Sequence, residues 1–262
     1  MKNWYITGDF HGHWDNFFNR ISQISVENAA VIVLGDAGFN FYLNKTDKKL
    51  KEKVNNLGVR VYCVRGNHEQ RPELVENMTL AFDIETENTV YMEQDYPNIL
   101  YFRDGATYLL NGYRTLILGG AYSVDKWYRL QRKWTWFENE QLTPEEQMNI
   151  LEECRGNEYD FILSHTCPFS WQPTDLFLSS VDQSTVDNNT EYWLETIKNE
   201  VSWGHWLFGH FHDNRMVRPY VEMYYNIIDS LDNIIERWTK YRLGEDYSVE
   251  FLDKDPKFHW GL

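Results

Sequence analysis

The chain has 262 residues, of which 42% are hydrophobic and 16% aromatic, so it can bury a sizeable core and general disorder is not expected. Its formal net charge of −15 argues against non-specific binding to nucleic acid, because such binding depends on Lys and Arg contacts to phosphate. We expect no membrane association, since the chain has neither a secretory signal nor an apolar run long enough to span a bilayer. Its three cysteines are too few for a disulfide framework and favour a cytoplasmic compartment.

Five short apolar runs predict β-strands that are buried on both faces, because these runs lack polar alternation. In chain order they cover residues 4–6, 31–34, 59–64, 161–163 and 206–208. Residues 220–228 form a further strand-like run, and the tail that follows to residue 262 is expected to be polar and rich in strands.

Helices are expected between these runs, at residues 13–25, 46–57, 143–154 and 191–201. The start of the third is the clearest, because Thr143 offers a cap, Pro144 suits the first helical position and acids follow in the first turn. Strands that alternate with helices predict an α/β protein. A single domain over residues 1–262 is the simplest account, with residues 80–112 and 172–190 expected to be inserted loops or small hairpins over the site.

A motif rich in Gly, Asp, His or Asn follows each of the five apolar runs. The motifs are GDFHG from Gly8, GD from Gly35, GNHE from Gly66, SH from Ser164 and GHFH from Gly209. They contain seven oxygen or nitrogen donors that suit divalent first-row metals, namely Asp9, His11, Asp36, Asn67, His165, His210 and His212. Seven donors are too many for one four-coordinate ion and suit two ions that share a carboxylate, a common device for hydrolysing phosphoesters. The carboxyl ends of strands, where these motifs fall, are where open α/β sheets bind ligands.

The order of these motifs resembles the DxH, GD, GNH, H, GHxH series of calcineurin-like metallophosphoesterases over residues 8–212. The resemblance implies a two-sheet β-sandwich flanked by helices, a four-layer αββα fold with a two-metal centre at one edge. It assigns the first metal to Asp9, His11 and His212, the second to Asn67, His165 and His210, and the bridge to Asp36. The expected cofactors are two divalent ions, manganese first, with iron, zinc or magnesium as alternatives.

The same resemblance implies a metal-dependent phosphoesterase that cleaves a phosphomonoester or phosphodiester through a hydroxide bridging the two metals. His68 resembles the family histidine that faces the leaving group, so we expect it to stabilise the transition state or protonate the departing oxygen. The expected substrate is a phosphorylated small molecule or a nucleotide. Arg71 and Arg65, on either side of the GNHE motif, are candidate phosphate ligands, although a structural ion pair is the favoured role for Arg65.

One position departs from the family pattern. Phe39 stands where many members carry a second Asp after GD, the acid that often orients the catalytic histidine. Its absence leaves the partner of His68 open between Glu69 and an acid from elsewhere such as Asp125. It also weakens the alternative of a Ser/Thr protein phosphatase. A non-catalytic scaffold is a further alternative, which the loss of a ligand would mark, and no ligand is lost.

Residues 126–137, KWYRLQRKWTWF, combine four basic with five aromatic side chains. Such a mixture can stack a nucleobase and steer a phosphate. The favoured interpretation is instead a helix or loop that packs through Trp127, Trp134 and Trp136 and keeps its charges in solvent. Because residues 119–123 leave a strand end on the metal side, the stretch is expected to border the pocket.

Overall fold

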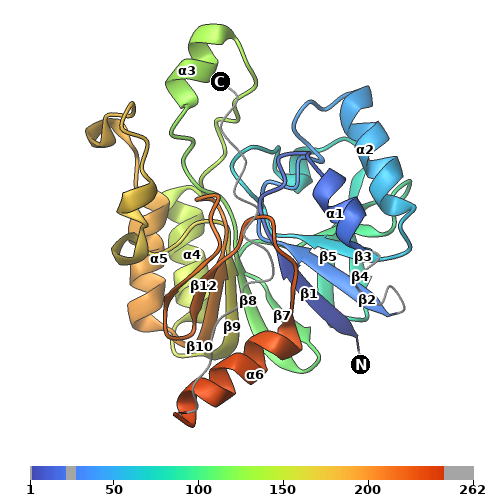
Figure 1. The fold of residues 1–262 in the computed structure, drawn as a ribbon. Coiled ribbons are helices and arrows are strands. Elements are labelled where there is room, and N and C mark those ends of the chain that lie inside the picture. The colour runs from blue at the N-terminus through green and yellow to red at the C-terminus, as the bar shows by residue number, and fades with distance from the viewer. Residues whose placement is uncertain (1, 22–27, 245–262) are drawn as a thin grey trace.

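The computed structural model describes residues 2–21 and 28–244, which form two face-to-face β-sheets with helices on both outer faces (Figure 1). This is the four-layer αββα sandwich implied by the motif order, and the fold prediction is confirmed. No helix in the described part of the chain is long and apolar enough to cross a membrane.

The first sheet has seven strands in the order β13-β1-β2-β3-β6-β5-β4. They are β1 (Asn3–Thr7), β2 (Ala29–Val33), β3 (Arg60–Cys63), β4 (Met78–Asp83), β5 (Asn88–Glu93), β6 (Ile99–Tyr101) and β13 (Asp229–Ser230). Strands β1, β2, β3 and β6 run parallel, so their carboxyl ends lie along one edge of the sheet.

The second sheet has six strands in the order β11-β12-β10-β9-β8-β7. They are β7 (Thr107–Leu110), β8 (Tyr113–Leu118), β9 (Glu158–Ser164), β10 (Ser202–Phe208), β11 (Arg215–Arg218) and β12 (Val221–Met223). Strands β8, β9, β10 and β12 run parallel and end at the same edge of the sandwich as the parallel strands of the first sheet (Figure 1).

The helices are α1 (Asp15–Arg20), α2 (Lys45–Asn55), α3 (Lys126–Arg132), α4 (Pro144–Cys154), α5 (Asn189–Glu200) and α6 (Leu231–Arg242). Helices α1 and α2 cover the first sheet and α4 and α5 the second, while α3 projects beyond one edge (Figure 1). Short 3₁₀ turns η2 (Pro72–Leu74), η3 (Phe169–Trp171), η4 (Thr174–Leu176) and η5 (Gln183–Thr185) complete the described elements.

The five predicted strands lack polar alternation because successive residues of each strand pack into two different hydrophobic cores. In β2, Ala30 and Ile32 pack between the sheets, while Val31 and Val33 pack against α1 and α2. The same alternation holds in β10, where Leu207 faces the core between the sheets and its neighbours face α4 and α5. A strand buried on both faces exposes no position to water and therefore needs no polar residue.

The five strand predictions and the helix predictions match the structure, except that residues 22–25 of the first helix lie outside the described residues. The predicted cap of α4 is confirmed in detail. Thr143 accepts a hydrogen bond from the backbone of Glu146, and the Glu146 carboxylate accepts one from the backbone of Thr143.

Two expectations need correction. Residues 80–112 include a hairpin, formed by β4 and β5, but they are not loops over the site, because the hairpin and strands β6 and β7 belong to the two sheets. The described part of the tail after β13, residues 231–244, contains no strand, because residues 231–242 form α6. Its buried positions Leu231, Ile234 and Trp238 follow the helical period, with polar residues between them. Residues 245–262 lie outside the described chain.

Candidate metal centre

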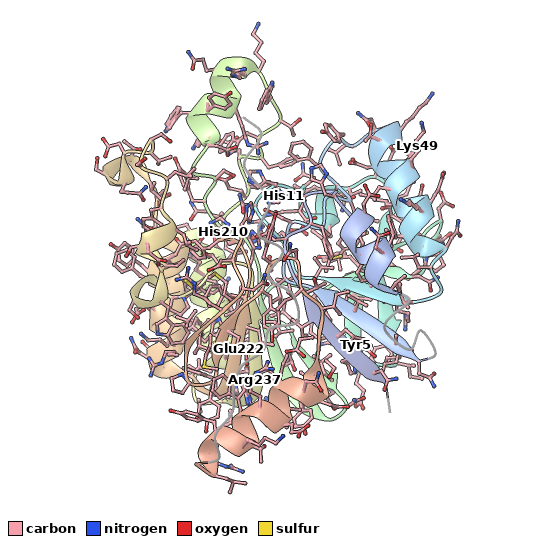
Figure 2. The ribbon with its side chains drawn as sticks, in the orientation of Figure 1. Tyr5, His11, Lys49, His210, Glu222 and Arg237 are labelled. Atoms are coloured by element: carbon pink, nitrogen blue, oxygen red, sulfur yellow. The ribbon has the colours of Figure 1, made fainter. Side chains whose placement is uncertain are left out.

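The five motifs leave the carboxyl ends of β1, β2, β3, β9 and β10 and meet at one edge of the sandwich. In Figure 2, His11 from the first sheet and His210 from the second lie close to each other at this edge. A cavity of about 500 Å³ opens here. Its lining includes six of the seven predicted metal ligands, namely Asp9, His11, Asp36, Asn67, His210 and His212, together with His68. His165 lies behind them and is fully buried.

The three donors predicted for the first metal converge on one point. The Nε2 atom of His11 lies 2.9 Å from Oδ1 of Asp9 and 2.8 Å from Nε2 of His212, and the latter two atoms are 3.5 Å apart. Donors held at about 2.0–2.2 Å from one ion lie roughly 3 Å from each other, so these atoms fit a single cation. Both carboxylate oxygens of Asp9 are buried and lack a well-oriented hydrogen-bond donor among the described residues, a need that a cation would meet.

A second group of donors lies beside the first and shares Asp36 with it. Oδ1 of Asn67 is 2.8 Å from Nε2 of His165. Oδ2 of Asp36 is 3.4 Å from Nε2 of His165 and 3.7 Å from Nε2 of His11. The ring centroid of His210 lies 5.0 Å from that of His165. The Asp36 carboxylate therefore lies between the two groups, as a bridging ligand must.

Hydrogen bonds from behind the site orient two ligands of the second group. Nδ1 of His165 lies 2.8 Å from the carbonyl oxygen of Leu34, so Nδ1 carries the proton and Nε2 is free to coordinate. The amide nitrogen of Asn67 donates to Oγ of Ser123 at 2.9 Å, and Ser123 is hydrogen-bonded to the buried carboxylate of Glu140. These bonds turn the Asn67 carbonyl oxygen toward the centre. No pattern in the sequence indicates this role of Ser123 and Glu140, although residues 119–123 are expected at a strand end.

The backbone of the motifs is held in an unusual conformation. The left-handed φ angles are 60° at Asp9, 45° at His11, 51° at Asp36, 69° at His210 and 54° at His212. Each costs a non-glycine residue on the order of 1–3 kcal/mol, and such residues cluster at functional sites. Five of the seven predicted ligands therefore occupy conformations that the chain adopts at a cost.

Two glycines allow the ligand loops to approach each other. A Cβ atom on Gly35 would lie 2.0 Å from Nδ1 of His165, and Gly35 has a φ of +94°. A Cβ atom on Gly66 would lie 1.9 Å from Oδ1 of Asp36. The motif glycines are thus needed because ligand side chains pass directly over their backbone.

The buried carboxylates make the site attractive to positive charge. Burial lowers the pKa of His11, but Asp9 and Asp36 outweigh it and raise that pKa to about 9. Burial likewise lowers the pKa of His165, and Asp36 above all raises it to about 9. The site therefore favours cations at this point, and bound metal ions would supply that charge in place of protons.

His68 occupies a different environment. Burial lowers its pKa to about 4, against the opposing effect of Asp36, and His11 and Arg129 lower it further. The imidazole is thus neutral at pH 7. Its backbone N–H donates to Oδ1 of Asp36 at 2.8 Å, and its ring lies 5.1 Å from that of His11. His68 therefore lies beside the predicted metal ligands, within the cavity.

The structure distinguishes between the two acids considered as partners of His68. Glu69 accepts a hydrogen bond from the backbone of Gly66 at 2.8 Å and does not line the cavity. Asp125 does line it and acts electrostatically on His68. Phe39, at the position of the missing acid, is fully buried and stacks on Trp14 at a ring-centroid distance of 4.9 Å. Of these two acids, Asp125 is thus the one that shares the cavity with His68.

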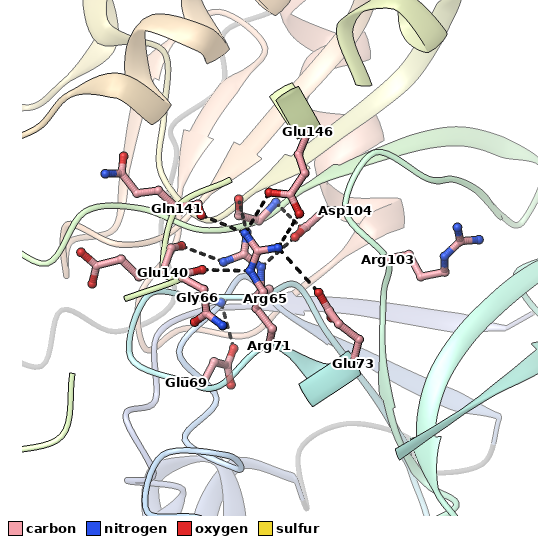
Figure 3. A network of polar contacts seen from close by, with 12 residues as sticks. Arg65, Gly66, Glu69, Arg71, Glu73, Arg103, Asp104, Glu140, Gln141 and Glu146 are labelled. Carbon is pink, nitrogen blue, oxygen red and sulfur yellow. Dashed lines mark hydrogen bonds and ion pairs between the residues drawn. The ribbon is translucent and has the colours of Figure 1, made fainter. Parts of the chain in front are cut away.

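The two arginines considered for phosphate binding lie in structural networks (Figure 3). Arg65 pairs with Asp104 at 2.7 Å and donates to two backbone carbonyls. Arg71 pairs with Glu146 at 2.6 Å and also donates to two backbone carbonyls. Neither lines the cavity. This corrects the expected substrate role of Arg71, because its guanidinium group already binds a carboxylate and carbonyls of neighbouring loops. For Arg65 the favoured role, a structural ion pair, is confirmed.

Residues 126–137 border the cavity as expected, but their tryptophans do not all pack. Trp127 is 63% and Trp134 51% exposed, so the prediction that they anchor the stretch is wrong. Trp136 is partly buried and donates to Glu140 at 2.9 Å. Arg129, on α3, lines the cavity. The stretch is therefore a projecting arm attached to the site at its base.

The sandwich fold and the ligands gathered at its strand ends define the class of metallophosphoesterases. The family model described as calcineurin-like phosphoesterase matches residues 4–214, so the chain belongs to this family of metal-dependent phosphoesterases. Among solved structures, a phosphopantetheinyl hydrolase from Mycobacterium tuberculosis is similar, with 13% identity, 99% of each chain covered and a TM-score of 0.46. No curated protein matches the chain.

Proposed function

We propose that the protein hydrolyses a phosphomonoester or phosphodiester at this centre, with two divalent cations held by the seven predicted ligands. The observation that carries the proposal is the position of Asp36. Its Oδ2 atom lies 3.7 Å from His11 and 3.4 Å from His165, between two separate groups of donors. A carboxylate shared by two groups is what a dinuclear hydrolytic centre requires.

When bound, two divalent cations would supply Lewis-acid polarisation of the phosphate and of the attacking water. The residues of the chain would position the phosphate and the attacking water. Asn67, a neutral donor, limits the negative charge that a phosphate dianion meets. In the reaction a water oxygen bonds to phosphorus, the bond from phosphorus to the leaving oxygen breaks, and that oxygen receives a proton.

His68 is the residue we assign to the leaving group. As a neutral imidazole it can donate one N–H hydrogen bond to a phosphate or departing oxygen. Negative charge on a bound phosphate raises the pKa of a neighbouring imidazole, which favours its protonation once substrate is present. Asp125, in the same cavity, is the proposed orienting acid in place of the residue missing at Phe39.

The substrate class follows from the size and lining of the cavity. A volume of about 500 Å³ suits a phosphorylated small molecule or a nucleotide. Manganese is the first metal to test. We further propose a cytoplasmic location, because all three cysteines are free and buried. Nothing in the site favours a protein phosphatase or a non-catalytic scaffold.

The test uses Asp36→Asn and His68→Asn with manganese and two chromogenic substrates, p-nitrophenyl phosphate and its bis-ester. Both variants should lose on the order of 100-fold or more in kcat. His68→Asn should keep its metal content, while Asp36→Asn should bind fewer ions. Unchanged hydrolysis by both variants would overturn the proposed mechanism.

A further inference from the structure

The lining of the cavity contains one Lys or Arg side chain among the described residues, that of Arg129. Four carboxylates line the same space, those of Asp9, Asp36, Asp125 and Glu191. Two of these are predicted metal ligands, so bound cations would offset their charge. Arg129 is then the lining side chain best suited to a phosphate oxygen, because guanidinium groups bind phosphate through directed, charge-assisted hydrogen bonds.

The arm that carries Arg129 is joined to the metal site at its base. Ser123, whose hydroxyl holds the Asn67 amide, also accepts a hydrogen bond through its carbonyl from the backbone of Lys126 at 3.0 Å. Helix α3 begins at Lys126. The helix thus starts three residues after Ser123, which orients Asn67, and Arg129 lies one turn along it. This short connection fixes the position of Arg129 relative to the predicted metal ligands.

The guanidinium of Arg129 is held in place and still has a free donor group. Its Nε donates to Oδ2 of Asp125 at 2.7 Å and its Nη1 to the carbonyl of Thr135 at 3.4 Å. Its Cζ lies 5.6 Å from the centre of the Phe41 ring. No described residue accepts a hydrogen bond from Nη2. The side chain is 15% exposed, so it is ordered by its neighbours and open to the cavity.

A purely structural role explains this arrangement poorly. The pair between Asp125 and Arg129 spans one helical turn, and such pairs contribute little to stability. No side chain of α3 is buried, so the pair does not support a packed core. The buried pair of Arg65 and Asp104 has a structural role. Arg129 instead faces the cavity that the predicted metal ligands line.

We propose that Arg129 binds a phosphate oxygen of the substrate, with Asp125 holding its guanidinium in position. This inference rests on the proposed function, since it assigns the substrate phosphate to the same cavity. Helix α3 is then the substrate-binding arm of the enzyme, and residues 126–137 belong to the site through Arg129.

The experiment compares Arg129→Ala, Arg129→Lys and the control Arg132→Ala. Arg132 lies on the same helix, contacts the Tyr128 ring at 4.5 Å and does not line the cavity. Calorimetry measures the binding of inorganic phosphate to manganese-loaded protein. Steady-state kinetics with p-nitrophenyl phosphate give KM and kcat, and elemental analysis gives the metal content.

Arg129→Ala should weaken phosphate binding and raise KM by about tenfold or more, with full metal content. Arg129→Lys should restore part of the loss, and Arg132→Ala should behave like the wild type. Equal phosphate affinity in Arg129→Ala and wild type would overturn the proposal. Because phosphate binding needs no turnover, a wild-type protein that binds phosphate but hydrolyses no ester would sink the proposed function alone, and the Arg129 comparison would still stand.

Discussion

The proposed metal centre depends on single residues that let five loops meet within a few ångströms. The ligands accept left-handed backbone angles, and the glycines between them accept side chains passing overhead. Both features lower the stability of the fold in order to place the predicted ligands close together, as is usual at functional sites. Even a substitution that adds only a methyl group at these positions should therefore weaken metal binding strongly.

Gly35→Ala should disrupt the second metal position. Its new Cβ would lie 2.0 Å from Nδ1 of His165, so the imidazole must move and its bond to Leu34 must break. We expect metal content to fall well below that of the wild type after manganese loading, measured by elemental analysis. The matched control is Gly58→Ala, which shares a positive φ of +77° but has nothing within 4 Å of its new Cβ. It should lose roughly 1–2 kcal/mol of stability and keep its metals. Equal metal content in the two variants would contradict this account.

Ser123→Ala tests the orientation of Asn67. Without the hydroxyl, the Asn67 amide loses its partner at 2.9 Å and its carbonyl oxygen is no longer fixed toward the centre. Affinity for one of the two ions should fall about 10–100-fold in a manganese titration. The exposed Ser170→Ala serves as the control. Identical titrations of Ser123→Ala and wild type would show that Asn67 does not depend on this contact.

Among the helices and strands, those with a clear local sequence signal were predicted best. Apolar runs ending in glycine-rich motifs located the strands, and Thr143 with Glu146 located the start of α4. Helix α6 was missed because only three of its residues are buried, so polar residues dominate its composition. Strands β4 and β5 were missed because most of their positions are partly or fully exposed, which weakens the pattern. Strand β6 is fully buried, but its run of three residues is too short to identify a strand.

Glu146 gives α4 a pH-dependent contribution to stability. A hydrogen bond from Arg71 is the main reason that its pKa falls from 4.5 to about 2. A lowered carboxylate pKa stabilises the fold above the unfolded value and loses this effect as pH falls toward the folded value. Glu146→Gln should therefore melt below wild type at pH 7, and the difference should shrink between pH 4.5 and 2. The neighbouring exposed Glu145→Gln is the control, and a difference independent of pH would contradict the assignment.

Across the whole molecule, the metal centre and an ionic cluster occupy opposite ends of the sandwich (Figure 2). Arg237 of α6 pairs with the fully buried Glu222 at 2.7 Å and with Asp229 at 2.8 Å. Trp238 also donates to Glu222. These contacts join α6 to β12 and β13, in different sheets, so α6 closes the end of the core away from the site.

Arg237→Ala should destabilise the fold without affecting the metal centre. Removing one partner leaves the Glu222 carboxylate buried without its positively charged partner, which typically costs about 3–5 kcal/mol. Urea unfolding measures the loss, and metal content should stay unchanged. Arg242→Ala, at the exposed end of α6, is the control. A loss of stability no larger than that of the control would show that the cluster is not a structural closure.

The sequence identified the candidate metal ligands more readily than the residues that surround them, for a reason that concerns the whole fold. The ligands follow strands whose ends must meet at one edge, so their proximity follows from the topology. The contacts of Ser123, Glu140 and Arg129 depend on how loops from the second sheet cross to the first. No local pattern encodes that crossing, and the role of Arg71 as a phosphate ligand was wrongly predicted for the same reason.

The most direct test of the dinuclear hydrolase is a titration of metal-free protein with manganese, following bound metal and hydrolysis of p-nitrophenyl phosphate together. Activity should rise with bound manganese and reach its maximum at two ions per chain, because both donor groups share Asp36. Hydrolysis that persists in metal-free protein, or that is complete with one ion per chain, would contradict the account.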